Sequence, residues 1–243
     1  MRRHFRFLAL VTLVGALLVP APAQALTYVQ INAETLATDA EFCGSATNTF
    51  TVPSYETLAV VGETGRLTGS CNINLTDGAR LYFQRATIKS LNPAGYLGVF
   101  GHGQTALTME DSKVSLTFEY INPSLSATHP GNASVEIVRT VFDGPIVVLA
   151  SCDGGRIRFL ESEFVSGIAS GYVLFLITSA ASDCTGPFQR SASIEVRNSS
   201  FDTRGGGVVF EVYTPPAAYG TLVVRETKFA PGDAYSHVPN PSP

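Results

Sequence analysis

The stretch Ile194–Phe201, IEVRNSSF, is one of six segments that share an eight-residue pattern. The pattern reads apolar, any, apolar, any, any, small, any, apolar. The other five repeats are LYFQRATI from Leu81, LTMEDSKV from Leu107, VEIVRTVF from Val135, IRFLESEF from Ile157 and LVVRETKF from Leu222. Neighbouring repeats are separated by about 28 residues on average, a period that is typical of stacked repeat architectures.

Each repeat is predicted to form a strand, a tight bend and a second short strand, because apolar residues alternate at its first and third positions. A further strand-like run follows most repeats: YLGVF from Tyr96, SLTFEY from Ser115, PIVVLA from Pro145, GYVLFLI from Gly171 and GGVVFEVY from Gly206. No segment after Leu26 shows the 3.6-residue period over ten or more residues, so helices do not supply the crossovers that parallel strands usually need. A solenoid, in which each coil lies beside the previous one, explains both the recurring strands and the lack of crossover helices.

The unit φ-x-φ-x-[NDER]-[ST]-x-φ, where φ is apolar, resembles that of the right-handed parallel β-helix (pectin-lyase-like) superfamily. The resemblance covers about Leu58 to Phe229, and IEVRNSSF is its best example. In that superfamily short strands flank a bend often occupied by Asn-Ser, and the aromatic residue that follows stacks inside. The resemblance implies an all-β, right-handed parallel β-helix (solenoid) of about six to eight coils.

Four parts are expected along the chain: a signal peptide at 1–25, an N-terminal capping segment at 26–55, the β-helix at 56–230 and a Pro-rich tail at 231–243. Three arginines precede the apolar run Phe7–Val19, which is too short to span a bilayer, and Ala23-Gln24-Ala25 follows it. The run LAVVGETGRL from Leu58 is interpreted as a degenerate first coil. We therefore expect a secreted, periplasmic or cell-surface protein with no membrane-spanning segment in the mature chain.

The charge balance limits the classes of partner. Without the three arginines of the signal peptide, 13 basic residues remain against 20 acidic ones. Phosphate recognition needs a basic patch, so nucleic acid is not expected as a partner. A glycan or another surface protein remains as the expected partner.

All four cysteines lie after the signal peptide, and an even count in an exported chain predicts two disulfides. Four cysteines allow three pairings, between which spacing alone does not decide. Cys43 and Cys71 are 28 residues apart and Cys152 and Cys184 are 32 apart, so the members of each pair are separated by about one coil. The repeat therefore favours Cys43–Cys71 and Cys152–Cys184 over a zinc site, for which no C-x-x-C is present.

Charged residues recur at the outward positions of the repeat. The fifth position reads Arg85, Asp111, Arg139 and Glu161 in successive repeats, and then Asn198 and Glu226. The second position holds Glu136, Arg158 and Glu195 in succession. Because equivalent residues of neighbouring coils stack closely, this alternation predicts ladders of opposite charge that fix the register.

Catalytic and metal-binding motifs are not recognised, and no cofactor is expected. Gly101-His102-Gly103 is similar to the histidine motif of the polygalacturonase family, but the NTD and paired-aspartate motifs of that family are absent and its RIK motif is RIR at Arg156–Arg158. His102 is therefore interpreted as a loop residue, and Arg158 as part of a charge ladder. Three sequons are possible glycosylation sites, at Asn74, Asn132 and Asn198, although Asn198 is favoured as a bend residue.

The resulting functional hypothesis is an exported, non-catalytic β-helix that serves as a structural, adhesive or glycan-binding module. A small carbohydrate-active enzyme, either a polysaccharide lyase or a glycoside hydrolase with a divergent site, is the alternative. A coil-bearing piece of a larger surface protein is a third possibility.

Overall fold

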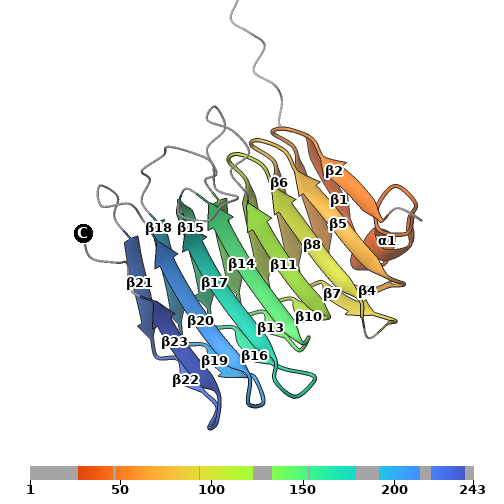
Figure 1. Cartoon of the computed structure of the whole chain (residues 1–243). Coiled ribbons are helices and arrows are strands. Elements are labelled where there is room, and N and C mark those ends of the chain that lie inside the picture. Colours follow the sequence, from red (N-terminus) through yellow and green to blue (C-terminus); the bar gives the residue numbers. More distant parts are fainter. Residues whose placement is uncertain are drawn as a thin grey trace, which may run out of the picture.

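The structure is a computed structural model that describes residues 27–45, 48–92, 94–122, 133–152, 154–178, 192–213 and 220–238. These residues form a parallel β-solenoid of three sheets, as the repeat predicts (Figure 1). Within each coil the chain passes from a strand of sheet A to a short strand of sheet C and then to a strand of sheet B. The three sheets contain eight, seven and eight strands respectively, in agreement with a prediction of about six to eight coils.

Sheet A carries the first half of every repeat. Its strands, in spatial order, are β1 (Tyr28–Ile31), β3 (Thr57–Val61), β6 (Arg80–Gln84), β9 (Ala106–Glu110), β12 (Ala133–Val138), β15 (Gly155–Leu160), β18 (Ala192–Arg197) and β21 (Gly220–Arg225).

Sheet C carries the second half of every repeat. Its strands are β4 (Thr64–Leu67), β7 (Thr87–Ser90), β10 (Lys113–Ser115), β13 (Val141–Phe142), β16 (Glu163–Val165), β19 (Ser200–Asp202) and β22 (Lys228–Phe229).

Sheet B is built from the runs between repeats. Its strands are β2 (Thr49–Val52), β5 (Ser70–Leu75), β8 (Tyr96–Gly101), β11 (Thr117–Asn122), β14 (Ile146–Cys152), β17 (Tyr172–Thr178), β20 (Gly207–Tyr213) and β23 (Ala234–Val238). Because β23 pairs with β20, the strands continue past residue 230, into the segment expected to be the tail.

The register of sheets A and C confirms the alignment of the repeats. Ile194 pairs with Ile157 on one side and with Leu222 on the other, and Phe201 pairs with Phe164 and Phe229 in the same way. The rings of Phe201 and Phe229 stack at 5.6 Å. Stacked apolar side chains of this kind fill the interior of the solenoid along its whole described length.

The fifth position of the repeat has a left-handed backbone in all six repeats. The φ angles are positive at Arg85, Asp111, Arg139, Glu161, Asn198 and Glu226, between 47° and 52°. Gly62 holds the same position in the degenerate first coil, with a φ of 70°. This conformation produces the sharp bend between sheets A and C, the role that was favoured for Asn198.

In five of the six repeats the sixth position carries a hydroxyl group at the bend, whereas the first repeat has Ala86. Ser199 Oγ donates a hydrogen bond to the Arg197 carbonyl (2.7 Å) and accepts one from the Ser162 backbone N–H of the neighbouring coil (3.2 Å). Ser162 does the same with Leu160 and Thr140, at 2.7 and 3.0 Å. A buried row of hydroxyls therefore satisfies backbone groups at the bends and ties each coil to the next.

One end of the solenoid is covered by the helix α1 (Ala33–Thr38), which lies between β1 and β2 in the chain (Figure 1). The Asn32 side chain caps it by accepting a hydrogen bond from the Thr35 N–H (2.7 Å). Ala33, Leu36 and Ala37 are at most 2% exposed and form the face that packs on β4. This helix occupies the place that a strand of sheet C takes in the later coils.

Candidate binding face

The outer faces of sheets A and C carry ion pairs. Arg158 bonds to Glu136 (2.6 Å) and to Glu195 (3.0 Å), so the ladder predicted from the second position is present. At the fifth position, Arg139 pairs with Asp111 at 2.6 Å. On sheet C, Lys113 pairs with Asp143 at 2.7 Å. These exposed pairs set the register more than they add stability.

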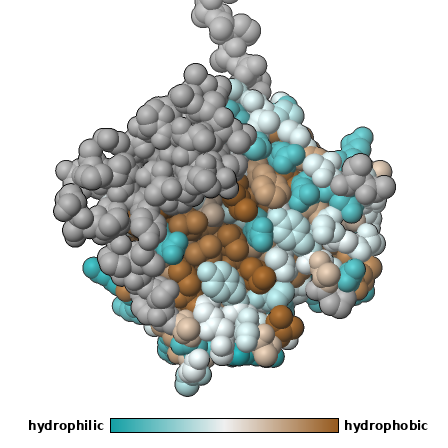
Figure 2. All heavy atoms as spheres, in the orientation of Figure 1, coloured by the Kyte–Doolittle hydropathy of each residue, from teal (hydrophilic) through white to brown (hydrophobic). Residues whose placement is uncertain are grey.

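The outer face of sheet B is different, because apolar and aromatic residues dominate it. Its two parts are defined here by their outward residues. The polar–aromatic region, on β5, β8 and β11, consists of Asn72, Asn74, Tyr96, Phe100 and Glu119. The aliphatic region, on β11, β14, β17 and β20, consists of Ile121, Val148, Ala150, Leu174, Leu176 and Val209. All of these side chains are partly exposed, and Figure 2 shows hydrophobic surface gathered on this face.

Two aromatic rings lie over a glycine in the polar–aromatic region. Tyr96 and Phe100 point outward on either side of Gly98, and a Cβ added to Gly98 would lie 2.7 Å from Tyr96 Cε1 and 2.8 Å from Phe100 Cε2. Gly98 itself is buried, because the rings cover it. The absence of a side chain at this position allows the two rings to lie along the strand and form a platform.

Polar groups border this platform on both sides. Strand register places Asn72 on one side of Gly98 and Glu119 on the other, and it places Asn74 beside Phe100. Tyr96 donates a hydrogen bond to Glu119 Oε2 (3.1 Å). Burial, together with the charge of Glu119 and this bond, raises the pKa of the Tyr96 hydroxyl, so Tyr96 is neutral at physiological pH. Asn72 Oδ1 is buried and has no hydrogen-bond partner among the residues that the structure describes.

The adjacent carboxylates of Glu110 and Asp111, at the end of β9 in sheet A, are unsuited to acid catalysis. Arg139 bonds to both Glu110 and Asp111, and Tyr82 donates a hydrogen bond to Glu110 (2.8 Å). The pKa of Glu110 is lowered chiefly by the hydrogen bond from Tyr82 and next by the one from Arg139. The pKa of Asp111 is lowered by the hydrogen bond from Arg139. A glycosidase needs one carboxyl group that stays protonated, which is the opposite shift.

Metal binding has no structural support in the described part of the chain. No cluster of three or more His, Cys, Asp or Glu side chains able to hold a metal ion occurs there. The same residues include no helix with the length and apolarity needed to cross a membrane.

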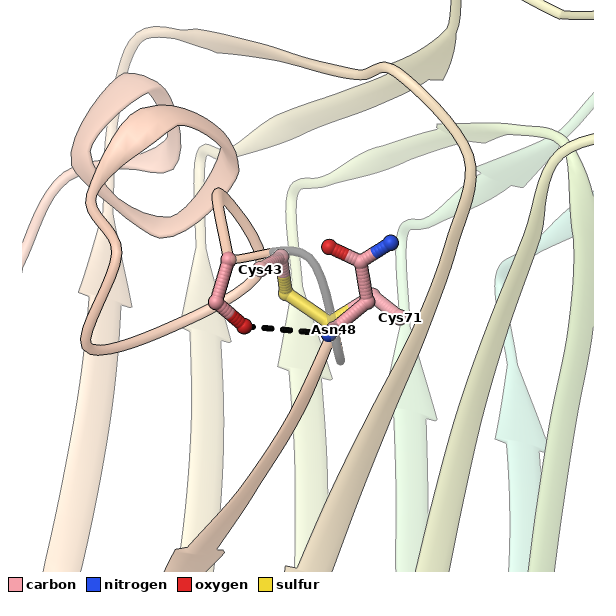
Figure 3. The surroundings of a disulfide bond; sticks show 4 residues. Cys43, Asn48 and Cys71 are labelled. Atoms are coloured by element: carbon pink, nitrogen blue, oxygen red, sulfur yellow. Dashed lines mark hydrogen bonds between the residues drawn. A yellow bond between two sulfur atoms is a disulfide. The ribbon is translucent and has the colours of Figure 1, made fainter.

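The first predicted disulfide is confirmed. Cys43, which follows α1, is bonded to Cys71 of β5, with a Cα–Cα distance of 5.3 Å (Figure 3). The adjacent Asn48 donates its backbone N–H to Ser45 Oγ at 3.0 Å. Cys152 ends β14, but Cys184 lies outside the described residues, so the bond between them stays a prediction.

The other described residues that the sequence singles out are on different elements of the fold. Asn74 is on the outer face of sheet B, Asn198 is exposed at a bend, and Asn132 lies outside the described residues. His102 is in the short connection between β8 and β9, where its backbone N–H donates to the Leu75 carbonyl (2.8 Å). Its Nδ1 is buried, with no hydrogen-bond partner in the described part of the chain.

Sequence reasoning missed Tyr96, Phe100 and Glu119 as possible binding residues. The runs YLGVF and SLTFEY were recognised as strands, but their outward faces were not aligned with each other. The signal was present in the alternation of these runs: Tyr96, Gly98 and Phe100 occupy every second position of one strand, and Glu119 and Ile121 those of the next.

Because the comparisons with known proteins find no match, the class of this protein is defined by its fold. No protein-family model, no curated protein and no solved structure matches the chain. The protein is a parallel β-solenoid with one helix-covered end and an apolar outer face on sheet B.

Proposed function

We propose that this chain is an exported, non-catalytic binding module with a pectin-lyase-like β-helix, and that it binds a neutral glycan through the polar–aromatic region. Export rests on the predicted signal peptide and implies a secreted, periplasmic or cell-surface location. The observation that carries the binding proposal is the platform of Tyr96 and Phe100 over Gly98, bordered by amide and carboxylate groups.

The chemistry of the polar–aromatic region suits a sugar. A sugar ring has an apolar face of C–H groups, which packs against aromatic rings, and a rim of hydroxyls, which bond to amides and carboxylates. Asn72 and Asn74 are partly exposed and carry amide groups of the kind that bond to such hydroxyls.

The charge of the region favours a neutral glycan over an acidic one. Glu119 is its charged residue, and no lysine or arginine lies in β5, β8 or β11. The whole chain also carries a formal charge of −4. An acidic polysaccharide would therefore be repelled by the protein as a whole and would find no cation at the platform.

The non-catalytic part of the proposal rests on the acid–base chemistry of the described residues. The grouped carboxylates Glu110 and Asp111 are held in their charged form by hydrogen bonds from Arg139. Release of reducing ends from a bound glycan by the purified protein would contradict this part.

Binding is tested by titrating neutral and acidic oligosaccharides into the wild type and into Tyr96→Ala and Phe100→Ala. Each variant is expected to lose about tenfold or more in affinity for the neutral glycan, because it removes half of the stacking surface. Tyr172→Ala is the matched control, since Tyr172 is an outward tyrosine of the same sheet, 37% exposed, outside the region. Preference for acidic glycans, or equal losses in all three variants, would overturn the proposal.

A further inference from the structure

The aliphatic region continues the polar–aromatic region across sheet B. Phe100, the second ring of the platform, pairs with Ile121 of β11, and Ile121 pairs with Ala150 of β14. Ala150 pairs in turn with Leu176 of β17. One outward row therefore runs from an aromatic ring to aliphatic side chains over four strands, and Figure 2 shows the hydrophobic surface of this face.

A second outward row lies beside the first. Strand register sets Val148, Leu174 and Val209 side by side across β14, β17 and β20. These side chains are partly exposed, whereas the inward residue Val173 next to them is fully buried. The two rows form an apolar strip, two side chains wide, that begins at the platform.

Two carboxylates limit the strip at its ends. Glu119 precedes Val148 in the second row, and Glu211 follows Leu176 in the first. Tyr96 donates a hydrogen bond to Glu119 Oε2 (3.1 Å), which holds this carboxylate beside the platform. Between the two carboxylates the strip contains no charged residue.

We infer that the ligand of this face is a single glycolipid, whose neutral sugar lies on the platform and whose aliphatic chain lies along the aliphatic region. The inference rests on the proposed function, because the same polar–aromatic region holds the sugar, and it adds the class of the group attached to that sugar. Glu119 accepts hydrogen bonds from sugar hydroxyls where the sugar and the chain join. The chain then crosses the strands between the two aliphatic rows.

The length of the strip sets the length of chain that it binds. Three strand spacings of about 4.8 Å separate β11 from β20, which gives roughly 14 Å, or about 11 methylenes of an extended chain. An open face covers one side of the chain, so each methylene is expected to raise the affinity about twofold, against about fourfold for full burial. Methylenes beyond this length reach Glu211 and should add little.

Charge favours a single glycolipid over a membrane surface. No lysine or arginine lies in any strand of sheet B, although such residues attract proteins to anionic lipid. In the same coils, the outer face of sheet A carries the ion pairs of Arg158 with Glu136 and Glu195. Insertion of these coils into a bilayer would remove water from those charges. The face is therefore suited to hold one chain outside a bilayer.

The test is the affinity of the full mature chain for neutral alkyl glycosides that share one sugar and carry butyl, octyl or dodecyl chains. Titration calorimetry measures it below the concentrations at which the glycosides form micelles. Wild type is expected to bind the dodecyl glycoside about 100-fold more tightly than the butyl one, from about twofold for each of roughly seven added methylenes on the strip.

Leu174→Gln, in the middle of the strip, is expected to lose about tenfold in affinity for the dodecyl glycoside and to bind the free sugar like wild type. Leu160→Gln is the matched control, because Leu160 is a partly exposed leucine on the outer face of sheet A. It is expected to bind every probe like wild type. Leu176→Gln repeats the test if Leu174→Gln does not fold, which circular dichroism detects.

Three results would overturn the inference. The first is equal affinity for the butyl and dodecyl glycosides, and the second is an unchanged dodecyl affinity in the folded glutamine variants. The third is binding to vesicles that carry a neutral glycolipid without binding of the monomeric glycosides, which would assign the face to a membrane surface.

The sugar without a chain reports the proposed function separately. If a short neutral oligosaccharide binds and chain length has no effect, the inference fails and the glycan site stands. If the oligosaccharide does not bind, the proposed function fails. Tyr96→Ala should weaken the binding of butyl and dodecyl glycosides by the same factor, because both carry the same sugar. Chain-dependent binding that Tyr96→Ala leaves unchanged would overturn both.

Discussion

Single residues at the bend between sheets A and C decide where each coil turns. The fifth position of the repeat is left-handed in every repeat, yet it holds arginine, aspartate or glutamate in five of six. Side chains with a Cβ disfavour this backbone conformation, so these positions retain a conformational cost. In five of the six repeats a hydroxyl residue follows and offsets this cost by bonding across the bend, as Ser162 does with the Leu160 carbonyl (2.7 Å).

Replacing Glu161 by glycine is expected to stabilise the protein. Glu161 has a φ of 50° and is exposed, and glycine adopts this conformation without strain. The gain should be about 0.5–1 kcal/mol after allowing for the greater freedom of glycine in the unfolded chain. Urea unfolding measures it. The control Glu163→Gly, two residues later in β16, should instead lower the free energy of unfolding by about 0.5–1 kcal/mol. An increase for this control would show that the backbone angle at Glu161 is not the cause.

Among the elements, α1 has the most specific fit. Gly65 of β4 lies directly against the helix, and a Cβ on this residue would overlap the carbonyl oxygen of Ala33. Gly65 therefore holds the eighth position of the pattern in the first coil, whereas the later coils have an inward apolar side chain at that position. Cys43–Cys71 fastens the chain after α1 to β5.

Gly65→Ala is expected to destabilise the protein by about 1–3 kcal/mol, because backbone atoms of α1 must move to make room for the methyl group. Gly69→Ala is the control, since the nearest atom to its added Cβ would be Asn48 Nδ2 at 3.7 Å, an ordinary contact. Thermal unfolding of the two variants compares them. Equal melting temperatures would mean that α1 is not held against β4 in solution.

The whole molecule behaves as a stack whose register is set by rows of charge and hydroxyl groups. A shift by one coil would separate Arg139 from Asp111 and bring like charges together elsewhere. Hydrogen bonds from Arg139 lower the pKa of Asp111 and contribute to the lowering for Glu110. Because the folded pKa values are lowered, this stabilisation is present at neutral pH and is lost as the carboxylates protonate in acid.

Arg139→Gln is therefore expected to destabilise the protein at pH 7 more than at pH 3. The difference should begin to shrink near pH 4, where aspartate and glutamate of the unfolded chain take up protons, and should be lost as the pH falls through the lowered pKa values of the folded protein. Urea unfolding of both proteins at several pH values gives the result. A deficit of equal size at pH 3 and pH 7 would assign the effect of Arg139 to packing.

The limits of sequence reasoning follow from the same residues. The repeat predicted sheets A and C, the stacking of Phe201 on its neighbours and the Cys43–Cys71 bond, because each depends on a spacing of about one coil. The helix α1 was not recognised, since its six residues are too few for a helical period. Tyr96 and Glu119 were not brought together because the connections between sheets C and B vary in length, which hides the register of sheet B.

The covered end also has a consequence for how the protein is made. The residues of α1 and the first coil leave the ribosome before the rest, so a surface with fixed edges exists before the later coils emerge. Each new coil needs contact only with the one before it. The chain can thus be laid down in the order of its synthesis, with α1 as the base on which the coils are built.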